Sequence, residues 1–285
     1  MHRIASGDYE VGLDPDTGGG IAFLRWRGRD VLRPAASDAK GPLDLSCFPL
    51  VPYANRIASG RFRWRGRTVS LTPNMAGDPS PLHGDGWKTA WSVSEAAADR
   101  IVLEMRREAG EWPWAHAADL TVSADAGGVQ LELEVINLSE EVMPAGLGFH
   151  PYFPGRATGR LRTHVQAVWL TDKDLLPVRL APAEVFGDWA AGEPVSRQEL
   201  IDNCYTGWRG QADIWTSEDG PKVRLTASPN LRWLQVYSPP GQEFFCVEPV
   251  SHRPDALNAE DPKAEGVTAL DPGVTLAAWI RLEAS

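Results

Sequence analysis

The chain has 285 residues, and its 28 Lys and Arg are outnumbered by 38 Asp and Glu, which gives a formal net charge of −10. An acidic chain without a basic run is a poor binder of nucleic acid and of anionic membranes, so we expect neither as a partner. A hydrophobic content of 43% against 23% charged residues also excludes an intrinsically disordered protein.

The cysteines and the N-terminal residues indicate in which cellular compartment we expect the protein. The three cysteines, Cys47, Cys204 and Cys246, are widely spaced and form no CxxC motif. They therefore indicate neither a disulfide framework nor a zinc site, and reduced thiols in a cytoplasmic setting are the simplest interpretation. The first ten residues include no apolar segment of the kind found in secretory signal peptides. We expect a cytoplasmic protein.

Short stretches of alternating apolar and polar residues run along most of the chain, separated by turns. Such alternation buries one face of a strand and leaves the other in water. The triplet Gly18-Gly19-Gly20 predicts a hairpin turn before the first such stretch rather than a phosphate-binding loop, because no helix follows it. In chain order, strands are predicted over residues 21–26, 61–65, 68–71, 101–105, 118–122, 129–135, 162–170, 223–227, 231–237, 244–247 and 276–282.

Helical patterns are few. Residues 194–203 and 254–258 each have room for a turn or two of helix. No helical segment of ten or more residues separates successive strands, which argues against a parallel α/β sheet. The sequence predicts an all-β fold, a large antiparallel β-sandwich with few short helices, in which residues 1–285 form a single domain.

Two ionisable residues lie in apolar surroundings. Glu248 ends an apolar strand and precedes a proline. Partial burial there would raise the pKa of its carboxyl and suit a general base, and the alternative is a surface glutamate at a strand end. His150 lies between Phe149 and a Pro-Tyr-Phe run. Histidine is the side chain best able to exchange a proton near neutral pH, although a hydrogen-bonded core histidine would fit the same surroundings.

Other motifs carry less weight. His83 is followed by Gly84, and glycine allows a close approach of the backbone to a ligand, but such turns are common. Trp112 and Trp114 could form a stacking surface for a sugar, with core packing the simpler interpretation. The histidines show no HxH or HExxH spacing, so we expect no metal site. GxSxG, GxGxxG and Walker motifs are absent, which removes the standard routes to a serine hydrolase, a dinucleotide enzyme or an NTPase.

Six short motifs follow one another in a fixed order. They are Asn55-Arg56-Ile57 with Gly60-Arg61-Phe62, Leu82-His83-Gly84 with Trp87, His150-Pro151-Tyr152-Phe153, Asp202, Gln235-Val236-Tyr237, and Phe245-Cys246-Val247-Glu248-Pro249 with residues 254–258. In identity, order and spacing this set resembles the aldose 1-epimerase (galactose mutarotase) family, from about residue 10 to the C-terminus. The segment around His150 departs from the His-(Ser/Thr)-Tyr-Phe-Asn that galactose mutarotases usually carry, and is similar to divergent bacterial members, some of which act on modified sugars such as sulfoquinovose.

The resemblance implies a galactose mutarotase-like supersandwich with a sugar cleft on a concave sheet. It implies a cofactor-independent isomerase that interconverts the α and β anomers of a hexose, with Glu248 as the general base and His150 as the general acid. We expect a small-molecule sugar as the substrate and a monomer or homodimer in solution. The substrate-binding residues that it implies are Asn55, Arg56, His83, Tyr152, Asp202 and Gln235.

Three alternatives stay open. An epimerase of sulfoquinovose or of a hexose 6-phosphate would need arginines at one end of the cleft, with Arg56, Arg61, Arg63, Arg156 and Arg253 as candidates. A glycoside hydrolase or lyase could use Glu248 and Asp202 as a carboxylate pair. A non-catalytic carbohydrate-binding protein would not need Glu248 and His150 together.

Overall fold

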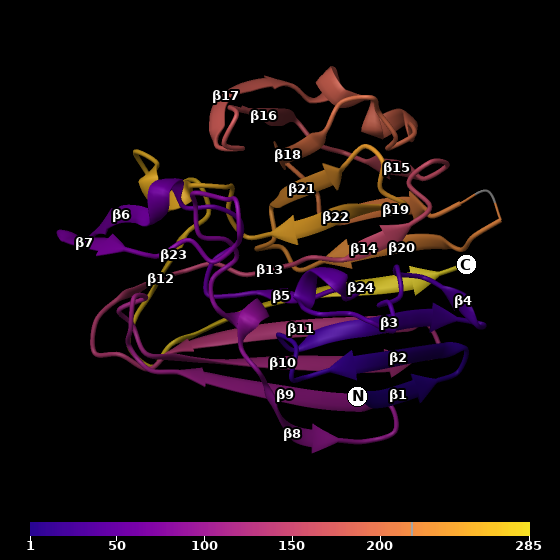
Figure 1. Cartoon of the computed structure of the whole chain (residues 1–285), viewed down its shortest axis with the longest axis horizontal. Coiled ribbons are helices and arrows are strands. Elements are labelled where there is room, and N and C mark those ends of the chain that lie inside the picture. The colour runs from indigo at the N-terminus through magenta and orange to yellow at the C-terminus, as the bar shows by residue number, and fades with distance from the viewer. Residues whose placement is uncertain (218) are drawn as a thin grey trace.

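The computed structural model describes residues 1–217 and 219–285, and their regular structure is almost entirely strand (Figure 1). Every pairing between the named strands is antiparallel, as the sequence predicts. Among the described residues, the only regular helices are 3-10 helices of three or four residues. These are η1 (Pro42–Asp44), η2 (Ala58–Gly60), η3 (Gly86–Lys88), η4 (Ala183–Phe186), η5 (Trp189–Ala191) and η6 (Ala256–Asn258). None of the described helices is long and apolar enough to cross a membrane.

One eight-stranded sheet, here called the outer sheet, shows the alternation expected from the sequence. On β10 and β11, buried and more exposed residues alternate along most of the strand, because one face packs on the core and the other meets water. Its strands lie in the order β15 (Arg160–Thr163), β19 (Gln211–Trp215), β20 (Lys222–Ala227), β24 (Thr275–Ala284), β11 (Gly128–Asn137), β10 (His116–Asp125), β9 (Arg100–Arg107) and β8 (Ser92–Ala96).

A second eight-stranded sheet, here called the cleft sheet, is buried on both faces over much of its centre. Its strand β22 (Phe244–Val250) is buried from Phe245 to Val250 without alternation. The remaining strands lie in the order β17 (Pro177–Pro182), β16 (Ala167–Thr171), β18 (Ile201–Thr206), β21 (Trp233–Ser238), then β22, β13 (Gly148–Phe149) and β5 (Pro49–Leu50), and β14 (Tyr152–Pro154) pairs separately with β22.

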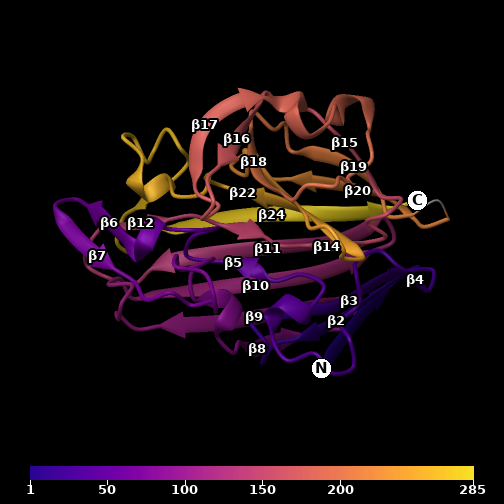
Figure 2. The same cartoon turned by 45° about the horizontal axis from the view of Figure 1, so that its top comes forward.

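Three smaller sheets complete the molecule. A four-stranded N-terminal sheet packs on β10 of the outer sheet, and Figures 1 and 2 show it covering one part of that sheet while the cleft sheet covers another. It is made of β1 (His2–Ser6), β2 (Tyr9–Asp14), β3 (Gly20–Trp26) and β4 (Arg29–Asp30), and the two other sheets are the pairs β6 (Arg61–Trp64) with β7 (Arg67–Ser70) and β12 (Met143–Ala145) with β23 (Thr268–Leu270). The predicted turn at 18–20 does join β2 to β3.

Apolar side chains form two clusters, one on each face of the cleft sheet. The larger cluster lies between the sheets and takes Phe245 and Val247 from β22. The smaller cluster lies on the opposite face and takes Cys246 and Val250. Because side chains alternate along a strand, Glu248 shares the face of Cys246 and Val250, so a carboxylate replaces an apolar residue on that face.

Two local predictions are wrong. Residues 162–170 form two strands rather than one, because the chain leaves the outer sheet after β15 and joins the cleft sheet at β16. Residues 194–203 form no helix. The backbone N–H of Val195 donates to the Gly159 carbonyl, and the Arg197 carbonyl accepts from the Arg156 side chain, so tertiary partners replace helical hydrogen bonds. The second predicted helical segment does contain η6.

Candidate functional site

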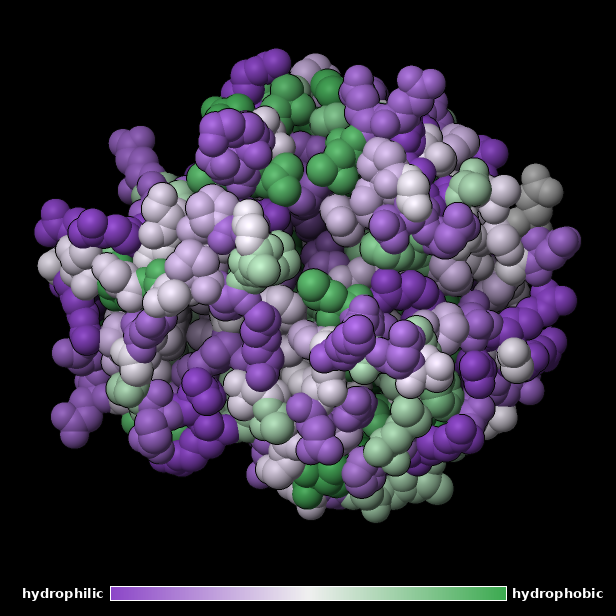
Figure 3. All heavy atoms as spheres, viewed as in Figure 1, coloured by the Kyte–Doolittle hydropathy of each residue, from purple (hydrophilic) through white to green (hydrophobic). Residues whose placement is uncertain are grey.

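A cleft of about 480 Å³ lies on the face of the cleft sheet that carries Glu248. Figure 3 shows a hollow near the middle of this face, with hydrophobic side chains on its rim and hydrophilic groups inside. Seven of the eight predicted site residues line the cleft: Asn55, Arg56, His83, His150, Tyr152, Asp202 and Glu248. The eighth, Gln235, is buried beside them but is not part of the cleft wall.

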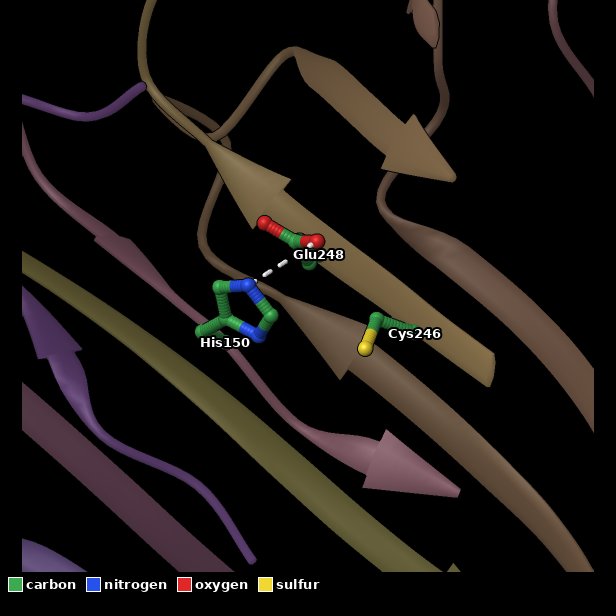
Figure 4. A group of neighbouring side chains, drawn as sticks. All are labelled: His150, Cys246 and Glu248. Carbon is green, nitrogen blue, oxygen red and sulfur yellow. Dashed lines mark ion pairs between the residues drawn. The ribbon is translucent and has the colours of Figure 1, made fainter. Parts of the chain in front are cut away.

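Strand register explains why His150 and Glu248 meet, although they are distant in sequence. Strand β22 pairs with β14 through Cys246 and Tyr152, and with β13 through Val250 and Gly148. Both pairs keep the same offset, so His150, in the break between β13 and β14, is opposite Glu248. The imidazole Nε2 lies 3.4 Å from the Glu248 Oε1 (Figure 4).

Strand β22 also contains a proline. Proline has no N–H to donate and is usually excluded from central strands. The sequence predicts a strand over residues 244–247 that closes at Glu248, but β22 continues through Pro249 to Val250. Glu248 therefore lies within a strand, and it is only 2% exposed.

The His150 ring is packed in a cluster of aromatic rings. The centroid of its ring lies 4.7 Å from that of Phe48 and 4.6 Å from that of Tyr152, and the Phe48 and Tyr152 centroids are 6.2 Å apart. The backbone N–H of His150 donates to the Phe48 carbonyl. These contacts fix the imidazole plane and leave little freedom except for proton exchange at its nitrogens.

Burial shifts the pKa values of the pair in opposite directions. Desolvation, with a contribution from Asp202, raises the pKa of Glu248 well above its ordinary value. Desolvation lowers the pKa of His150 to about 3. Both shifts favour uncharged side chains in the cleft, because a charge loses hydration when buried. The carboxyl and the imidazole therefore form a pair that can share one proton.

Asp202 and Arg56 form a second polar group in the cleft. The Arg56 Nε donates to Asp78 Oδ2 at 2.8 Å, and its Nη1 lies 3.6 Å from Asp202 Oδ2. The Gln235 amide donates to Asp202 Oδ1. Burial raises the pKa of Asp202 although Arg56 opposes that shift. Gln235 thus fixes the Asp202 side chain through a hydrogen bond. The Asp202 carboxylate offers a hydrogen-bond acceptor beside the Arg56 guanidinium.

Asn55 and His83 fix each other through two backbone segments. The Asn55 N–H donates to His83 Nδ1 at 3.0 Å, and the His83 N–H donates to the Asn55 carbonyl at 3.0 Å. Both residues have a left-handed backbone conformation, with φ of 58° for Asn55 and 60° for His83, which residues other than glycine rarely adopt. Since Nδ1 accepts a hydrogen bond, the neutral His83 carries its proton on Nε2 and acts there as a donor.

Cys246 lies beside the catalytic candidates. Its sulfur, the His150 ring and the Glu248 carboxylate offer ligand atoms within 4.8 Å of one another, which is a set that could hold a metal ion (Figure 4). Burial raises the pKa of the Cys246 thiol well above its ordinary value, which opposes the thiolate that a metal prefers. The absence of a metal stays a prediction from the sequence.

Several lining residues were not among the predicted site residues. Arg33, Tyr237 and Phe244 lie in the cleft wall, and Leu43, Met75, Leu175 and Leu200 add apolar surface. Tyr237 belongs to the motif that begins at Gln235 and could have been found from it. Arg33 gave no signal, because it belongs to none of the ordered motifs.

Other candidates lie outside the cleft. Trp112 and Trp114 are packed in the large core, as the simpler interpretation held. Asp85 contacts His116 at 3.4 Å and Arg107 at 2.9 Å. It therefore belongs to a separate polar cluster.

Comparisons with known proteins identify the family and the fold. The family model for aldose 1-epimerase matches residues 15–283. YphB, an uncharacterised protein of Escherichia coli K12, is 32% identical over 92% of this chain and 91% of its own length. A crystal structure of a candidate aldose 1-epimerase from Escherichia coli K12 is 28% identical, with a TM-score of 0.91 over 100% of this chain and 98% of that one. A galactose mutarotase-like protein from Clostridium acetobutylicum, at 21% identity, shares the fold with a TM-score of 0.88 over 99% of this chain and 94% of that one.

The family match spans nearly the whole chain, and the structural likeness includes the cleft sheet on which the paired carboxylate and imidazole lie. Together they show that this protein belongs to the aldose 1-epimerase family.

Proposed function

We propose that this protein is a cofactor-independent isomerase that interconverts the α and β anomers of a hexose. The observation that carries the proposal is the buried contact of 3.4 Å between His150 Nε2 and Glu248 Oε1 in the cleft. Ring opening of a sugar needs one group to take a proton and one to give a proton at adjacent oxygens. A paired carboxylate and imidazole meet that need.

The proton steps balance within the pair. The Glu248 carboxylate takes the proton of the C1 hydroxyl, the His150 imidazolium gives its proton to the ring oxygen, and the bond between C1 and that oxygen breaks. The aldehyde turns about the C1–C2 bond. The reverse transfers then close the ring on the other face of the carbonyl.

Opening the ring converts a charged pair into an uncharged one without exchanging a proton with solvent. The pKa of Glu248 is raised and that of His150 is lowered, so burial stabilises the uncharged pair. The reaction as written therefore begins when the proton that the pair shares lies on His150, and burial favours the protonated Glu248 and neutral His150 that accompany the open-chain sugar. Acid–base assistance of this kind contributes about 10²–10⁴ in rate for each group.

The remaining predicted residues suit a neutral, hydroxyl-rich ligand. The His83 Nε2 hydrogen and the Arg56 guanidinium can donate to sugar oxygens, and Asp202 can accept from a hydroxyl. Asn55 orients His83 through its backbone. Tyr152 supports the imidazole plane, and Gln235 acts through Asp202. We propose a free sugar in the cytoplasm as the ligand, and a monomer or homodimer.

The glycoside hydrolase alternative requires Asp202 to serve as the second catalytic carboxylate. Asp202 is instead held by Gln235 and lies against Arg56, whereas the nearest titratable partner of Glu248 is His150. A carbohydrate-binding protein would not need two groups with opposed pKa shifts. Anomer exchange is the reaction that uses both.

Polarimetry on freshly dissolved α-D-glucose and α-D-galactose tests the proposal. We expect the protein to speed the approach to an unchanged final rotation, and the ratio of the two rates will define the preference at C4. Release of new reducing ends from an oligosaccharide would support the hydrolase. Sugar binding without faster mutarotation of any hexose would support the binding protein.

A further inference from the structure

One asparagine outside the cleft wall holds the backbone on both sides of His83. The Asn74 Nδ2 donates to the Leu82 carbonyl at 2.7 Å and to the Gly84 carbonyl at 3.1 Å. The Asn74 Oδ1 accepts from the Leu82 N–H at 2.7 Å. A single side-chain amide thus closes around one residue with three hydrogen bonds. Asn74 itself is not part of the cleft wall, so its effect on a bound sugar must pass through a neighbour.

The backbone at His83 needs such support. Its φ of 60° is left-handed, and a residue other than glycine keeps this conformation only where its surroundings fix it. Leu82, His83 and Gly84 are buried, so their backbone groups depend on partners within the protein. Asn55 binds the N–H and the ring of His83. Asn74 binds the backbone of the residues before and after it.

The segment that carries Asn74 is itself anchored to the protein. Lys88, which follows the turn at His83, donates from its Nζ to the Asn74 carbonyl. Two residues before Asn74, Thr72 donates to the Glu111 carboxylate from its backbone N–H at 2.9 Å and from its hydroxyl at 2.6 Å. Asn74 therefore has a fixed place from which it can hold the turn, as a supporting residue of a binding site requires.

His83 is the residue of this turn that could donate to a sugar. It lines the cleft, and its ring centroid lies 5.5 Å from that of His150. Because its Nδ1 accepts from Asn55, the ring hydrogen that remains for a sugar oxygen is on Nε2. A shift of the turn would move this donor, and a misplacement of about 1 Å can cost about 10²-fold in rate.

We propose that Asn74 is a positioning residue for His83: it holds the turn at residues 82–84 so that the imidazole keeps its place in the cleft wall. This inference rests on the proposed function, in which His83 donates to a sugar oxygen. Asn74 acts through His83, and its loss leaves the acid–base pair of Glu248 and His150 intact. Its loss should therefore weaken sugar binding more than it slows the proton steps.

The test is a double-mutant cycle on Asn74→Ala and His83→Gln. The values of kcat and KM for anomer exchange would be measured by NMR on the sugar that the wild type exchanges fastest. We expect each single variant to lower kcat/KM by about tenfold, mainly through KM, because a hydrogen bond to the sugar is lost or misplaced. In the His83→Gln background, Asn74→Ala should change kcat/KM by less than about twofold, because the group that it positions is already gone.

Asn230 supplies a matched control. Its amide also bridges a turn, since its Nδ2 donates to the Ala277 carbonyl and its Oδ1 accepts from the Ser228 hydroxyl. Asn230→Ala should lower Tm, as Asn74→Ala does, but leave kcat and KM unchanged. Asn74→Asp is a second variant in case the alanine variant does not fold. It keeps the acceptor for the Leu82 N–H, loses both donated hydrogen bonds, and should raise KM in the same way.

Two results would overturn the inference and leave the proposed function intact. The first is an unchanged KM in both Asn74→Ala and Asn74→Asp. The second is an equal loss from Asn74→Ala in the wild-type and His83→Gln backgrounds, because Asn74 would then act through groups other than His83. No exchange of any hexose by the wild type would overturn the proposed function, and this inference with it.

Discussion

Two histidine–carboxylate contacts of equal length lie in this protein, in different surroundings. His150 and Glu248 are 3.4 Å apart in the cleft, and His116 and Asp85 are 3.4 Å apart outside it. Asp85 also pairs with Arg107 at 2.9 Å. The neighbours, rather than the distance, decide what each pair can do.

The pKa shifts of the two carboxyls differ in sign. Burial raises the pKa of Glu248, and the opposing effect of Arg56 does not compensate. Burial alone would also raise the pKa of Asp85, but His116 and Arg107 lower it below its ordinary value. A carboxyl with a raised pKa is suited to proton exchange, and one with a lowered pKa is suited to a permanent ion pair.

The largest expected effect is the loss of activity in Glu248→Gln. The amide keeps the shape of the side chain but cannot take the proton of the C1 hydroxyl. We expect the rate of anomer exchange to fall by about 10²–10⁴. The control is Asp85→Asn, which removes the carboxylate of the other pair and should leave the rate within about threefold. Similar losses in both variants would show that the cleft pair has no special role.

A second effect concerns pH. In the active form, Glu248 and His150 together hold one proton. The pair takes up a second proton only near the lowered pKa of His150, about 3. It loses its one proton when the pH rises above the raised pKa of Glu248. We therefore expect kcat/KM to stay nearly constant from about pH 5 to pH 6.5, where an ordinary histidine titrates. A rate-against-pH profile with a midpoint near 6.5 on its acid side would contradict the shifts.

A smaller effect concerns stability, and the two pairs should differ in sign. The pKa of Glu248 is higher in the folded protein than in the unfolded chain. Its contribution to the stability of the folded protein is therefore fully present below the pKa of the unfolded chain, and it is lost as the pH rises through the pKa of the folded protein. At pH 8, Glu248→Gln should therefore raise Tm by a few degrees. Asp85 has a lowered folded pKa, so its stabilisation is present at pH 8 and Asp85→Asn should lower Tm. Thermal unfolding of both variants at pH 8 checks the signs.

The smallest effect is expected from chelation. His150, Cys246 and Glu248 could together hold a metal, but the proposed reaction uses the first and last as acid and base. Treatment with EDTA followed by desalting should leave the rate unchanged. A loss that zinc restores would mean that the three residues act as metal ligands.

Much of the fold followed from local sequence patterns. Alternation predicted β10 and β11 because their second face meets water. The same reasoning failed at residues 162–170, since the change of sheet depends on partners far away in sequence. The structure of residues 194–203 likewise depends on tertiary hydrogen bonds to their backbone.

The candidate site was predicted in part. The ordered motifs gave most of the polar residues of the cleft, but the nearly complete burial of Glu248 depends on tertiary packing, which no local pattern indicates. The offset that places His150 opposite Glu248 is a property of register. Arg33, which also lines the cleft, was missed because it belongs to none of the motifs.

A double-mutant cycle on the cleft pair tests the central claim most directly. Exchange rates would be measured for the wild type, Glu248→Gln, His150→Gln and the double variant, on whichever sugar the wild type exchanges fastest. If the two residues act as one proton-sharing unit, the double variant should be about as slow as the slower single variant. Losses that multiply in the double variant would show that Glu248 and His150 act independently, and would contradict the account.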